Sequence, residues 1–220
     1  MPDKCIDLVL TDPPYCSGGF TEASRRSSNG SGLRSETRRD GGWFTADNMG
    51  SSGLLWLLRQ ISIEAKRVLK NNSSLLIFTD WRMIPIIEPA IESCGFRWQN
   101  MVVWNKGTAG IGRGFRATHE IILQFTNGVP RIFSEKEGNV LTVKKINPKE
   151  REHQTQKPIE LMERIINVLS EEGGVVLDPF SGSGSTLLAA NNLHRNFIGV
   201  EISPEYCKIA EQRLKQKPLL

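Results

Sequence analysis

The chain has 220 residues, of which 39% are hydrophobic and 24% are charged, an ordinary globular composition that fits one large domain with a sizeable core. A net charge of +4 is compatible with a polyanionic partner without requiring one. The sequence shows no apolar run near the roughly 18 residues of a membrane span, no signal-peptide pattern and no metal-type spacing of cysteine and histidine. It therefore predicts a cytoplasmic protein with no membrane segment and no metal site.

The first predicted element is a buried strand over residues 6–10, and Asp12-Pro13-Pro14-Tyr15 follows it directly. In open α/β sheets, ligands bind at the carboxyl ends of strands. Two successive prolines fix the backbone and remove two N–H donors, so the turn is stiff and its carbonyl groups stay available. Such a corner suits a planar amino group on a stacked base, although an ordinary turn at the end of a strand uses the same residue types.

A polar stretch rich in Gly, Ser, Asn and Arg follows, from about residue 16 to 52. Loops of this length are usually functional or disordered. Two interpretations remain open: a solvated loop, or a mobile arm that contacts phosphates and orders on binding. The arginines of this loop are Arg25, Arg26, Arg34, Arg38 and Arg39.

Apolar spacing predicts a helix over residues 54–69 that ends at the Asn71-Asn72 pair. A shorter helix is predicted over residues 84–94, with Pro85 near its start and Gly95 at its end. Strands are predicted over residues 74–79, 101–104 and 118–125. The last two are separated by a glycine-rich stretch that contains Lys106, Arg113 and Arg116 and no acid. Because no helix separates these two strands, we expect an antiparallel pair at one edge of the sheet. A polar stretch of short β-like pieces follows.

In the second half of the chain, predicted helices alternate with predicted strands. Helices are predicted over residues 158–169, 185–191 and 204–214, and strands over residues 175–177 and 197–200. Strands alternating with helices predict a doubly wound, mostly parallel α/β sheet that is covered on both faces.

A glycine-rich turn between a strand and a helix forms the second candidate site. Gly182 and Gly184 permit a tight turn and close approach of a ligand, while the following helix N-terminus favours negative groups. Glu201 ends a strand about 20 residues later, where an acid can accept both hydroxyls of a ribose. The third glycine of the nicotinamide fingerprint and the lysine of a P-loop are both missing. A purely structural turn is the alternative.

Together, Asp12-Pro13-Pro14-Tyr15 and the segment from Asp178 to Gly184 resemble the motifs of amino-group DNA methyltransferases that use S-adenosylmethionine. The catalytic motif precedes the cofactor motif, which is the circularly permuted order of their β group. Shorter segments match in sequence order across essentially the whole chain: residues 76–82, 104–106, 112–123 (with His119-Glu120) and 153–158. The resemblance implies a Rossmann-like methyltransferase fold with a seven-stranded, mostly parallel sheet and one antiparallel edge strand.

The resemblance also implies roles for individual residues. Asp12 and the Pro13 carbonyl would hold the target amino group while Tyr15 stacks on a base flipped out of the duplex. Lys157 would meet the methionine carboxylate of the cofactor, or would lie in solvent at the start of a helix. Glu201 would bind the ribose. The remaining residues expected to line the cofactor are Asp178, Phe180, Gly182, Gly184, Ser185 and Thr186.

The target nitrogen is a poor nucleophile because its lone pair is delocalised into the ring. Hydrogen bonds to Asp12 and a carbonyl favour a more pyramidal nitrogen, and positioning then allows direct in-line transfer without a metal or a covalent intermediate. Cytosine-N4 relatives more often carry Ser at the Asp12 position, which favours adenine N6. The alternatives are a cytosine-N4 enzyme, a non-catalytic subunit that binds DNA or cofactor, and a nicotinamide oxidoreductase.

The expected partner is double-stranded DNA, contacted by Lys106, Arg113, Arg116 and the arginine-rich loop. The interval of about residues 126–152, where relatives carry a target-recognition region, is short, so recognition is expected to be modest or shared with that loop. Relatives usually carry an acidic segment before the catalytic strand that contacts the adenine of the cofactor. A homodimer and a cognate restriction endonuclease are further partners that the resemblance leaves open.

Overall fold

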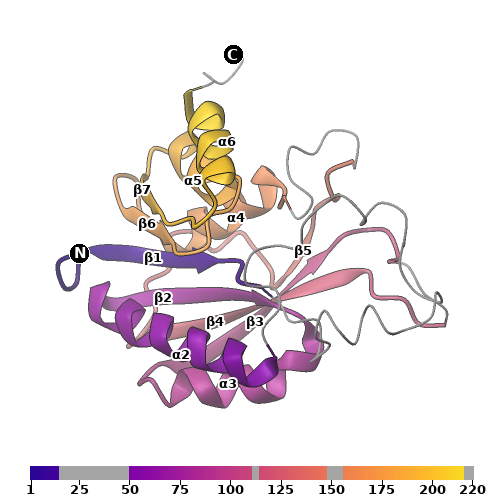
Figure 1. Ribbon diagram of the computed structural model, residues 1–220, viewed down its shortest axis with the longest axis horizontal. Helices are drawn as coiled ribbons and strands as arrows, with labels where there is room; N and C mark the ends of the chain where they lie inside the picture. The colour runs from indigo at the N-terminus through magenta and orange to yellow at the C-terminus, as the bar shows by residue number, and fades with distance from the viewer. Residues whose placement is uncertain (15–49, 111–113, 148–155, 216–220) are drawn as a thin grey trace.

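The computed structural model describes residues 1–14, 50–110, 114–147 and 156–215. These residues form one seven-stranded sheet with helices on both faces (Figure 1). The strands are β1 (Ile6–Thr11), β2 (Leu69–Thr79), β3 (Arg97–Asn105), β4 (His119–Asn127), β5 (Val140–Thr142), β6 (Val175–Asp178) and β7 (Asn196–Gly199). The helices are α2 (Ser51–Val68), α3 (Ile84–Glu92), α4 (Ile159–Leu169), α5 (Ser185–Asn192) and α6 (Pro204–Lys215), and the short 3-10 turn η2 (Trp81–Met83) precedes α3.

The sheet separates two hydrophobic cores. Helices α2 and α3 cover one face, and α4, α5 and α6 lie on the other (Figure 1). Val9 of β1 packs in the core that contains residues of α2, whereas Leu8 and Leu10 pack in the core that contains residues of α4. Successive side chains of a strand point to opposite faces, and all six residues of β1 are buried. Strand β1 is therefore held from both sides.

The order of strands is β5-β3-β4-β2-β1-β6-β7. The predicted seven-stranded α/β sheet is thus confirmed, but the position of its antiparallel strand was predicted wrongly. Strand β4 runs antiparallel to both β2 and β3, so it lies inside the sheet, and the edge strand β5 runs parallel to β3. No helix separates β3 from β4, so β4 returns directly beside β3. Strand β2 pairs with its other edge, and the six consecutive buried residues of β4 are typical of a strand that is covered on both faces.

The boundary between α2 and β2 also differs from the expectation. Helix α2 ends at Val68 and β2 begins at the next residue, so the Asn71-Asn72 pair lies inside the strand. Asn72 has a φ of 64°, and its side-chain oxygen accepts the Val129 N–H at 3.1 Å. The left-handed asparagine therefore bends an extended segment against a loop instead of ending the helix.

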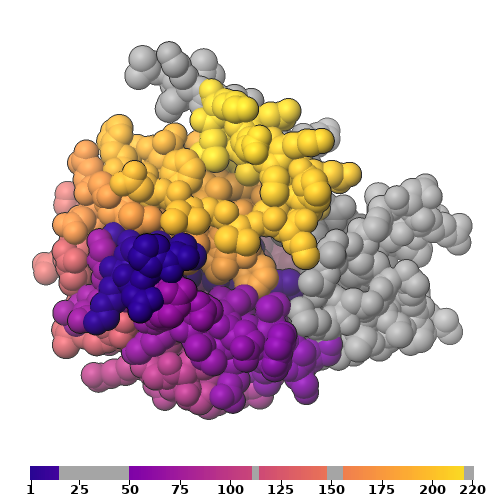
Figure 2. Space-filling model, turned by 60° about the vertical axis from the view of Figure 1, so that its left-hand side comes forward, coloured from indigo at the N-terminus to yellow at the C-terminus, as the bar shows by residue number. Residues whose placement is uncertain are grey.

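An ion pair fixes the amino end of β1. Asp7 is buried, and its two carboxylate oxygens each lie 2.8 Å from Lys70 Nζ of β2. The Val175 N–H of β6 donates to the same carboxylate at 2.9 Å. Strand β1 is thereby joined to both of its neighbours, and in Figure 2 the indigo N-terminal residues lie between the purple α2 region and the orange and yellow C-terminal elements.

Within the described ranges, no helix is long and apolar enough to cross a membrane. In the same ranges, no cluster of three or more His, Cys, Asp or Glu side chains could hold a metal ion.

Candidate active site

The first candidate site begins where β1 ends. Thr11 and Pro13 are buried, and the Asp12 side chain between them keeps 19% of its surface exposed. Pro14 is half-buried, and Tyr15 lies outside the described residues. Asp12 therefore stands at the carboxyl end of a central parallel strand, where ligands bind in sheets of this type.

Lys157, just before α4, connects Asp12 to a second carboxylate. Its Nζ lies 2.6 Å from Asp12 Oδ2 and 3.2 Å from Oε2 of Glu120, near the start of β4. The other oxygen of Glu120, Oε1, accepts from Lys106 Nζ at 3.2 Å. The ring of Phe78 lies 5.0 Å from Lys157 Nζ, within the range of a cation–π contact. We call these four charged residues the charged tetrad: Asp12, Lys157, Glu120 and Lys106.

Burial and pairing act in opposite directions on this tetrad. Burial disfavours the charged form of Lys157, yet the carboxylates of Asp12 and Glu120 raise its pKa overall. Burial also disfavours the charged form of Glu120, but Lys157 and Lys106 hold its pKa below the ordinary value. Both groups are therefore ionised at neutral pH. The alternative in which Lys157 lies in solvent is wrong, since only 8% of its side chain is exposed.

Asp178, at the carboxyl end of β6, links the two candidate sites. Its Oδ1 accepts from the Thr11 hydroxyl at 2.8 Å and from the Phe180 N–H at 3.0 Å, and its Oδ2 accepts from the Thr186 hydroxyl at 2.6 Å. Only 2% of Asp178 is exposed. Because Thr11 directly precedes Asp12, these hydrogen bonds hold the corner at Asp12 against the glycine-rich turn. A direct contact between Asp178 and a cofactor stays a prediction.

The protonation of Asp178 makes stability depend on pH. Burial raises the pKa of Asp178 to about 6, against hydrogen bonds from Thr186, Phe180 and Thr11 that lower it. In the unfolded chain the group titrates near its ordinary value, so between about pH 4 and pH 6 the folded state binds more protons. This carboxyl therefore lowers stability as pH rises through that window, by roughly 3 kcal/mol in total, and the loss persists above it.

We expect Asp178→Asn to remove this contribution to the pH dependence. The asparagine oxygen can accept from Thr11 and Phe180 while its amide donates to the Thr186 hydroxyl, so the hydrogen bonds have a neutral equivalent. Chemical denaturation at pH 4, 5, 6 and 7 measures the free energy of unfolding of both proteins. The wild type should lose stability relative to the variant as pH rises. Equal pH dependence in the two proteins would contradict a buried carboxyl with a raised pKa.

Glu201, two residues beyond β7, faces the glycine-rich turn. Its Oε2 accepts from the Gly182 N–H and its Oε1 from the Ser203 N–H, both at 2.8 Å. Gly182 has a φ of 51°, and a Cβ built there would meet no atom within 4 Å. Phe180 nearby is half-buried. Each carboxylate oxygen can accept a second hydrogen bond, so this acid and the open backbone beside it suit the hydroxyl groups of a ribose.

Gly184 and Ser185, at the start of α5, are instead surrounded by protein. Gly184 has a φ of 80°, and a Cβ built there would lie 2.9 Å from the Ala210 Cβ of α6. Arg213 of α6 is buried and donates to the Ser183 carbonyl at 2.6 Å and the Ser185 hydroxyl at 3.4 Å. Helix α6 therefore supports one side of the turn, while the Gly182 side stays open.

A DNA methylase family model, N6_N4_Mtase, matches residues 6–212. The chain belongs to this family. Type II methyltransferase M.HpaI of Haemophilus parainfluenzae is 30% identical over 240 residues, which cover 97% of this chain and 69% of that protein. DNA adenine methyltransferase YhdJ of Escherichia coli (strain K12) is 28% identical over 250 residues, which cover 97% of this chain and 78% of that protein. The chain in the crystal structure of the M1.HpyAVI-SAM complex is 26% identical in sequence. It superposes with a TM-score of 0.69, and the match covers 96% of this chain and 90% of that chain.

The residues of this methylase that were predicted to contact DNA are only partly described. Arg116 is exposed. Lys106 is 19% exposed and paired with Glu120, so its observed contact is within the charged tetrad. The predicted residues that lie outside the described ranges, besides Tyr15, are Arg113, Arg25, Arg26, Arg34, Arg38 and Arg39.

Three residues that shape the site of the methylase were not given roles from sequence. The sequence gives some indication that Glu120 belongs to the site, because His119-Glu120 lies in a segment that resembles the family. No local sequence pattern, however, pairs Glu120 with Lys157. Thr11 and Arg213 have no such signal, since their partners lie far away in sequence. Their roles emerge only from the packing of distant segments.

Proposed function

We propose that this chain transfers the methyl group of S-adenosylmethionine to the N6 amino group of adenine in double-stranded DNA, at a specific sequence. The observation that carries the proposal is the link between the two candidate sites. Thr11 and Asp178 join the Asp12 corner to the glycine-rich turn through a buried hydrogen bond of 2.8 Å. A carboxylate that accepts from an amino group and a turn that suits a nucleoside cofactor are thereby held side by side.

The glycine-rich turn fits the cofactor on two observations. The space beside Gly182 would admit a ligand against the backbone, and Glu201 has carboxylate oxygens next to that space. We assign Glu201 to the ribose hydroxyls, Gly182 and Phe180 to the adjoining surface, and Asp178 to holding the turn. When bound, S-adenosylmethionine supplies an electrophilic methyl group on a sulfonium centre.

Asp12 acts as a hydrogen-bond acceptor for the target amino group. Together with the Pro13 carbonyl it would hold the two N–H groups of a flipped base, and Tyr15 would stack on the ring. These hydrogen bonds favour a pyramidal nitrogen whose lone pair can attack in line. Asp12 need not be a strong base, because the nitrogen becomes acidic once it is methylated. Positioning and electrostatics therefore carry the reaction.

Adenine is the proposed base for two reasons. The residue before the two prolines is Asp12, where cytosine-N4 relatives more often have Ser. A relative that aligns with 97% of this chain is named a DNA adenine methyltransferase. We also propose the permuted β-group order, with the catalytic corner preceding the cofactor turn.

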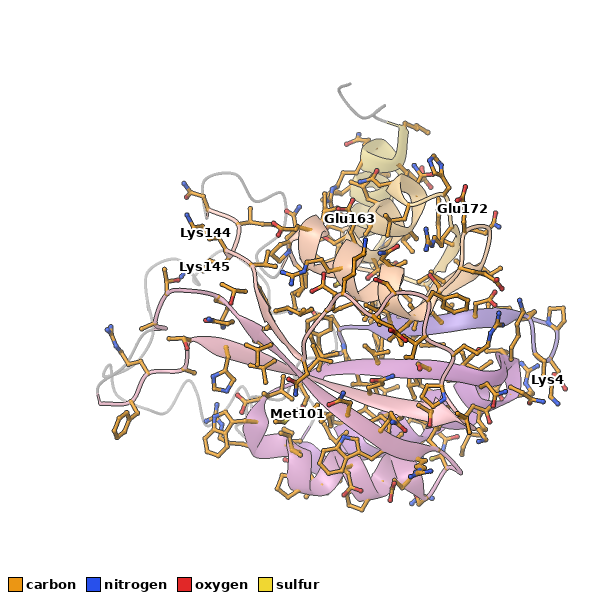
Figure 3. The ribbon with its side chains drawn as sticks, turned by 180° about the vertical axis from the view of Figure 1, so that it is seen from behind. Lys4, Met101, Lys144, Lys145, Glu163 and Glu172 are labelled. Carbon is orange, nitrogen blue, oxygen red and sulfur yellow. The ribbon has the colours of Figure 1, made fainter. Side chains whose placement is uncertain are left out.

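The duplex is proposed to lie along the carboxyl ends of the central strands. Arg116 and the fully exposed Phe115 are in the segment that joins β3 to β4, and Lys144 and Lys145 are exposed after β5. Figure 3 shows Lys144 and Lys145 at the end of the sheet opposite to Lys4. Residues 126–152 and the arginine-rich loop of residues 16–52 are proposed to share target recognition. A homodimer, a cognate endonuclease and a cytoplasmic location stay predictions.

Transfer of radioactivity from methyl-labelled S-adenosylmethionine to unmethylated genomic DNA tests the proposed reaction. We expect acid-precipitable label in DNA that survives protease and is released by nuclease. Single-stranded RNA of similar length serves as the control substrate and should remain unlabelled. A protein that binds the cofactor and DNA but transfers no label would be a non-catalytic subunit, which contradicts the proposal.

A further inference from the structure

We propose that Lys157 and Glu120 are positioning residues for the reaction: Lys157 orients the Asp12 carboxylate for the target amino group, and Glu120 holds Lys157. This inference rests on the proposed function, which makes Asp12 the acceptor. It differs from the expectation that Lys157 serves the cofactor, and it gives Glu120 a role that the motif alone does not suggest.

The geometry of the charged tetrad carries the inference. Lys157 Nζ lies between two carboxylates, 2.6 Å from Asp12 Oδ2 and 3.2 Å from Glu120 Oε2. Glu120 is itself held from the other side by Lys106 at 3.2 Å. Three segments thus converge at Lys157: the end of β1, the start of β4 and the segment before α4 that carries Lys157 itself. An ammonium held at two points has little freedom to swing away from Asp12.

The burial of the tetrad makes its charge balance important. The exposed fractions of the side chains are 8% for Lys157, 19% for Asp12 and Lys106, and 23% for Glu120. Two carboxylates alternate with two ammonium groups, so the charges cancel. Removing one member of a largely buried set leaves an uncompensated charge, which is much more costly than losing an exposed pair.

The ionised state of Asp12 is what the proposed chemistry requires. An ionised carboxylate only accepts hydrogen bonds, whereas a protonated one would present an O–H donor to the amino group of the base. An ammonium in direct contact stabilises the ionised form and restricts rotation of the carboxylate. Lys157 therefore provides both the charge state and the orientation of Asp12.

Other charged groups at this end of the sheet have their own partners. Asp178 faces Asp12 from β6 and is held by Thr11 and Thr186. Asp80, just after β2, accepts two side-chain hydrogen bonds from Arg82 and also interacts electrostatically with His119. If substitution of Lys157 shifts the pH–rate profile and substitution of Asp80 does not, the shift reports on the charged tetrad.

Lys157→Met tests the inference by removing the ammonium while keeping a long unbranched side chain. With saturating DNA and cofactor, we expect the single-turnover rate of methyl transfer to fall about 100-fold, since misplacement of a reacting group by about 1 Å has an effect of that size. The acid limb of the pH–rate profile should move to higher pH, because Asp12 loses the cation that favours its ionised form. The dissociation constant for S-adenosylmethionine, measured by calorimetry, should remain unchanged.

Glu120→Gln provides a milder second variant that keeps the side-chain volume. We expect a smaller loss of rate, again without a change in cofactor affinity. Lys157 still contacts Asp12 in this variant, but it loses its second carboxylate and is held less firmly in position. This variant also decides the matter if Lys157→Met fails to fold.

Lys70→Met is the matched control. It breaks a lysine–carboxylate pair that joins β2 to β1, with 2.8 Å contacts to Asp7, at the end of β1 opposite to Asp12. It should lower stability and leave the single-turnover rate and its pH profile unchanged. A purely structural role for Lys157 would give the same result as this control.

The outcomes are distinguishable. Wild-type rates in a folded Lys157→Met or Glu120→Gln protein would overturn the positioning role. Weakened cofactor binding in Lys157→Met, with a normal rate and pH profile at saturation, would make Lys157 a cofactor ligand instead. Absence of methyl transfer by the wild-type protein would overturn the proposed function itself, and the positioning role with it.

Discussion

Replacing Asp12 with alanine is expected to abolish methyl transfer, with a loss in kcat of about 1,000-fold or more, comparable to or larger than the loss of one preorganised polar contact to a transition state. The substitution removes the acceptor for the target amino group. It also takes one of two carboxylates away from Lys157, which lies 2.6 Å from Asp12 Oδ2. Both effects act on the reacting groups and leave the Gly182 and Glu201 side of the cofactor turn unchanged.

The Asp12→Ala protein should therefore still bind S-adenosylmethionine. Calorimetry gives the cofactor affinity, and label transfer to DNA under single-turnover conditions gives the rate. Asp3→Ala is a suitable control, because Asp3 is a largely exposed acid on the same N-terminal segment that pairs with Arg67. That control should behave as wild type. Full activity in Asp12→Ala would exclude Asp12 as the acceptor.

Two glycines of the cofactor turn are expected to respond differently to alanine. Both have positive φ, 51° at Gly182 and 80° at Gly184. Each substitution therefore lowers the free energy of unfolding by about 1 kcal/mol or more, because a residue with a side chain is strained in the left-handed conformation. At Gly184 the new Cβ would also lie 2.9 Å from Ala210 Cβ of α6, which adds overpacking. We expect Gly184→Ala to lower the free energy of unfolding by about 3 kcal/mol.

Gly182→Ala, in contrast, meets no protein atom within 4 Å. It should cost about 1 kcal/mol of stability but weaken S-adenosylmethionine binding, because the added methyl fills the space proposed for the cofactor. Chemical denaturation measures the first quantity and calorimetry the second. If Gly182→Ala binds the cofactor as tightly as wild type, the proposed position of the cofactor beside Gly182 is wrong.

Local sequence patterns were sufficient to predict much of the fold. The apolar runs before Asp12 and Asp178 predicted the buried strands β1 and β6, apolar spacing predicted α2, and a proline near the first turn supported the predictions of α3 and α4. These patterns depend on neighbouring residues in the chain, which is why they can be read without a structure. The same patterns put both candidate motifs at the carboxyl ends of strands, as observed.

Long-range pairing could not be predicted in this way. The place of β4 between β2 and β3 depends on which strands pair along its two edges, and the sequence predicted an antiparallel edge strand instead. The charged tetrad is a stronger case, because Lys157 and Asp12 are 145 residues apart. A lysine at the start of a predicted helix is usually exposed, and only the convergence of three segments buries this one.

One measurement tests the central claim most directly: mass spectrometry of nucleosides from unmethylated genomic DNA after incubation with the protein and S-adenosylmethionine. The account predicts N6-methyladenine, with the modified positions mapping to a defined sequence, and none with Asp12→Ala. N4-methylcytosine would contradict the proposed base, and the absence of any methylated nucleoside would contradict the proposed enzyme.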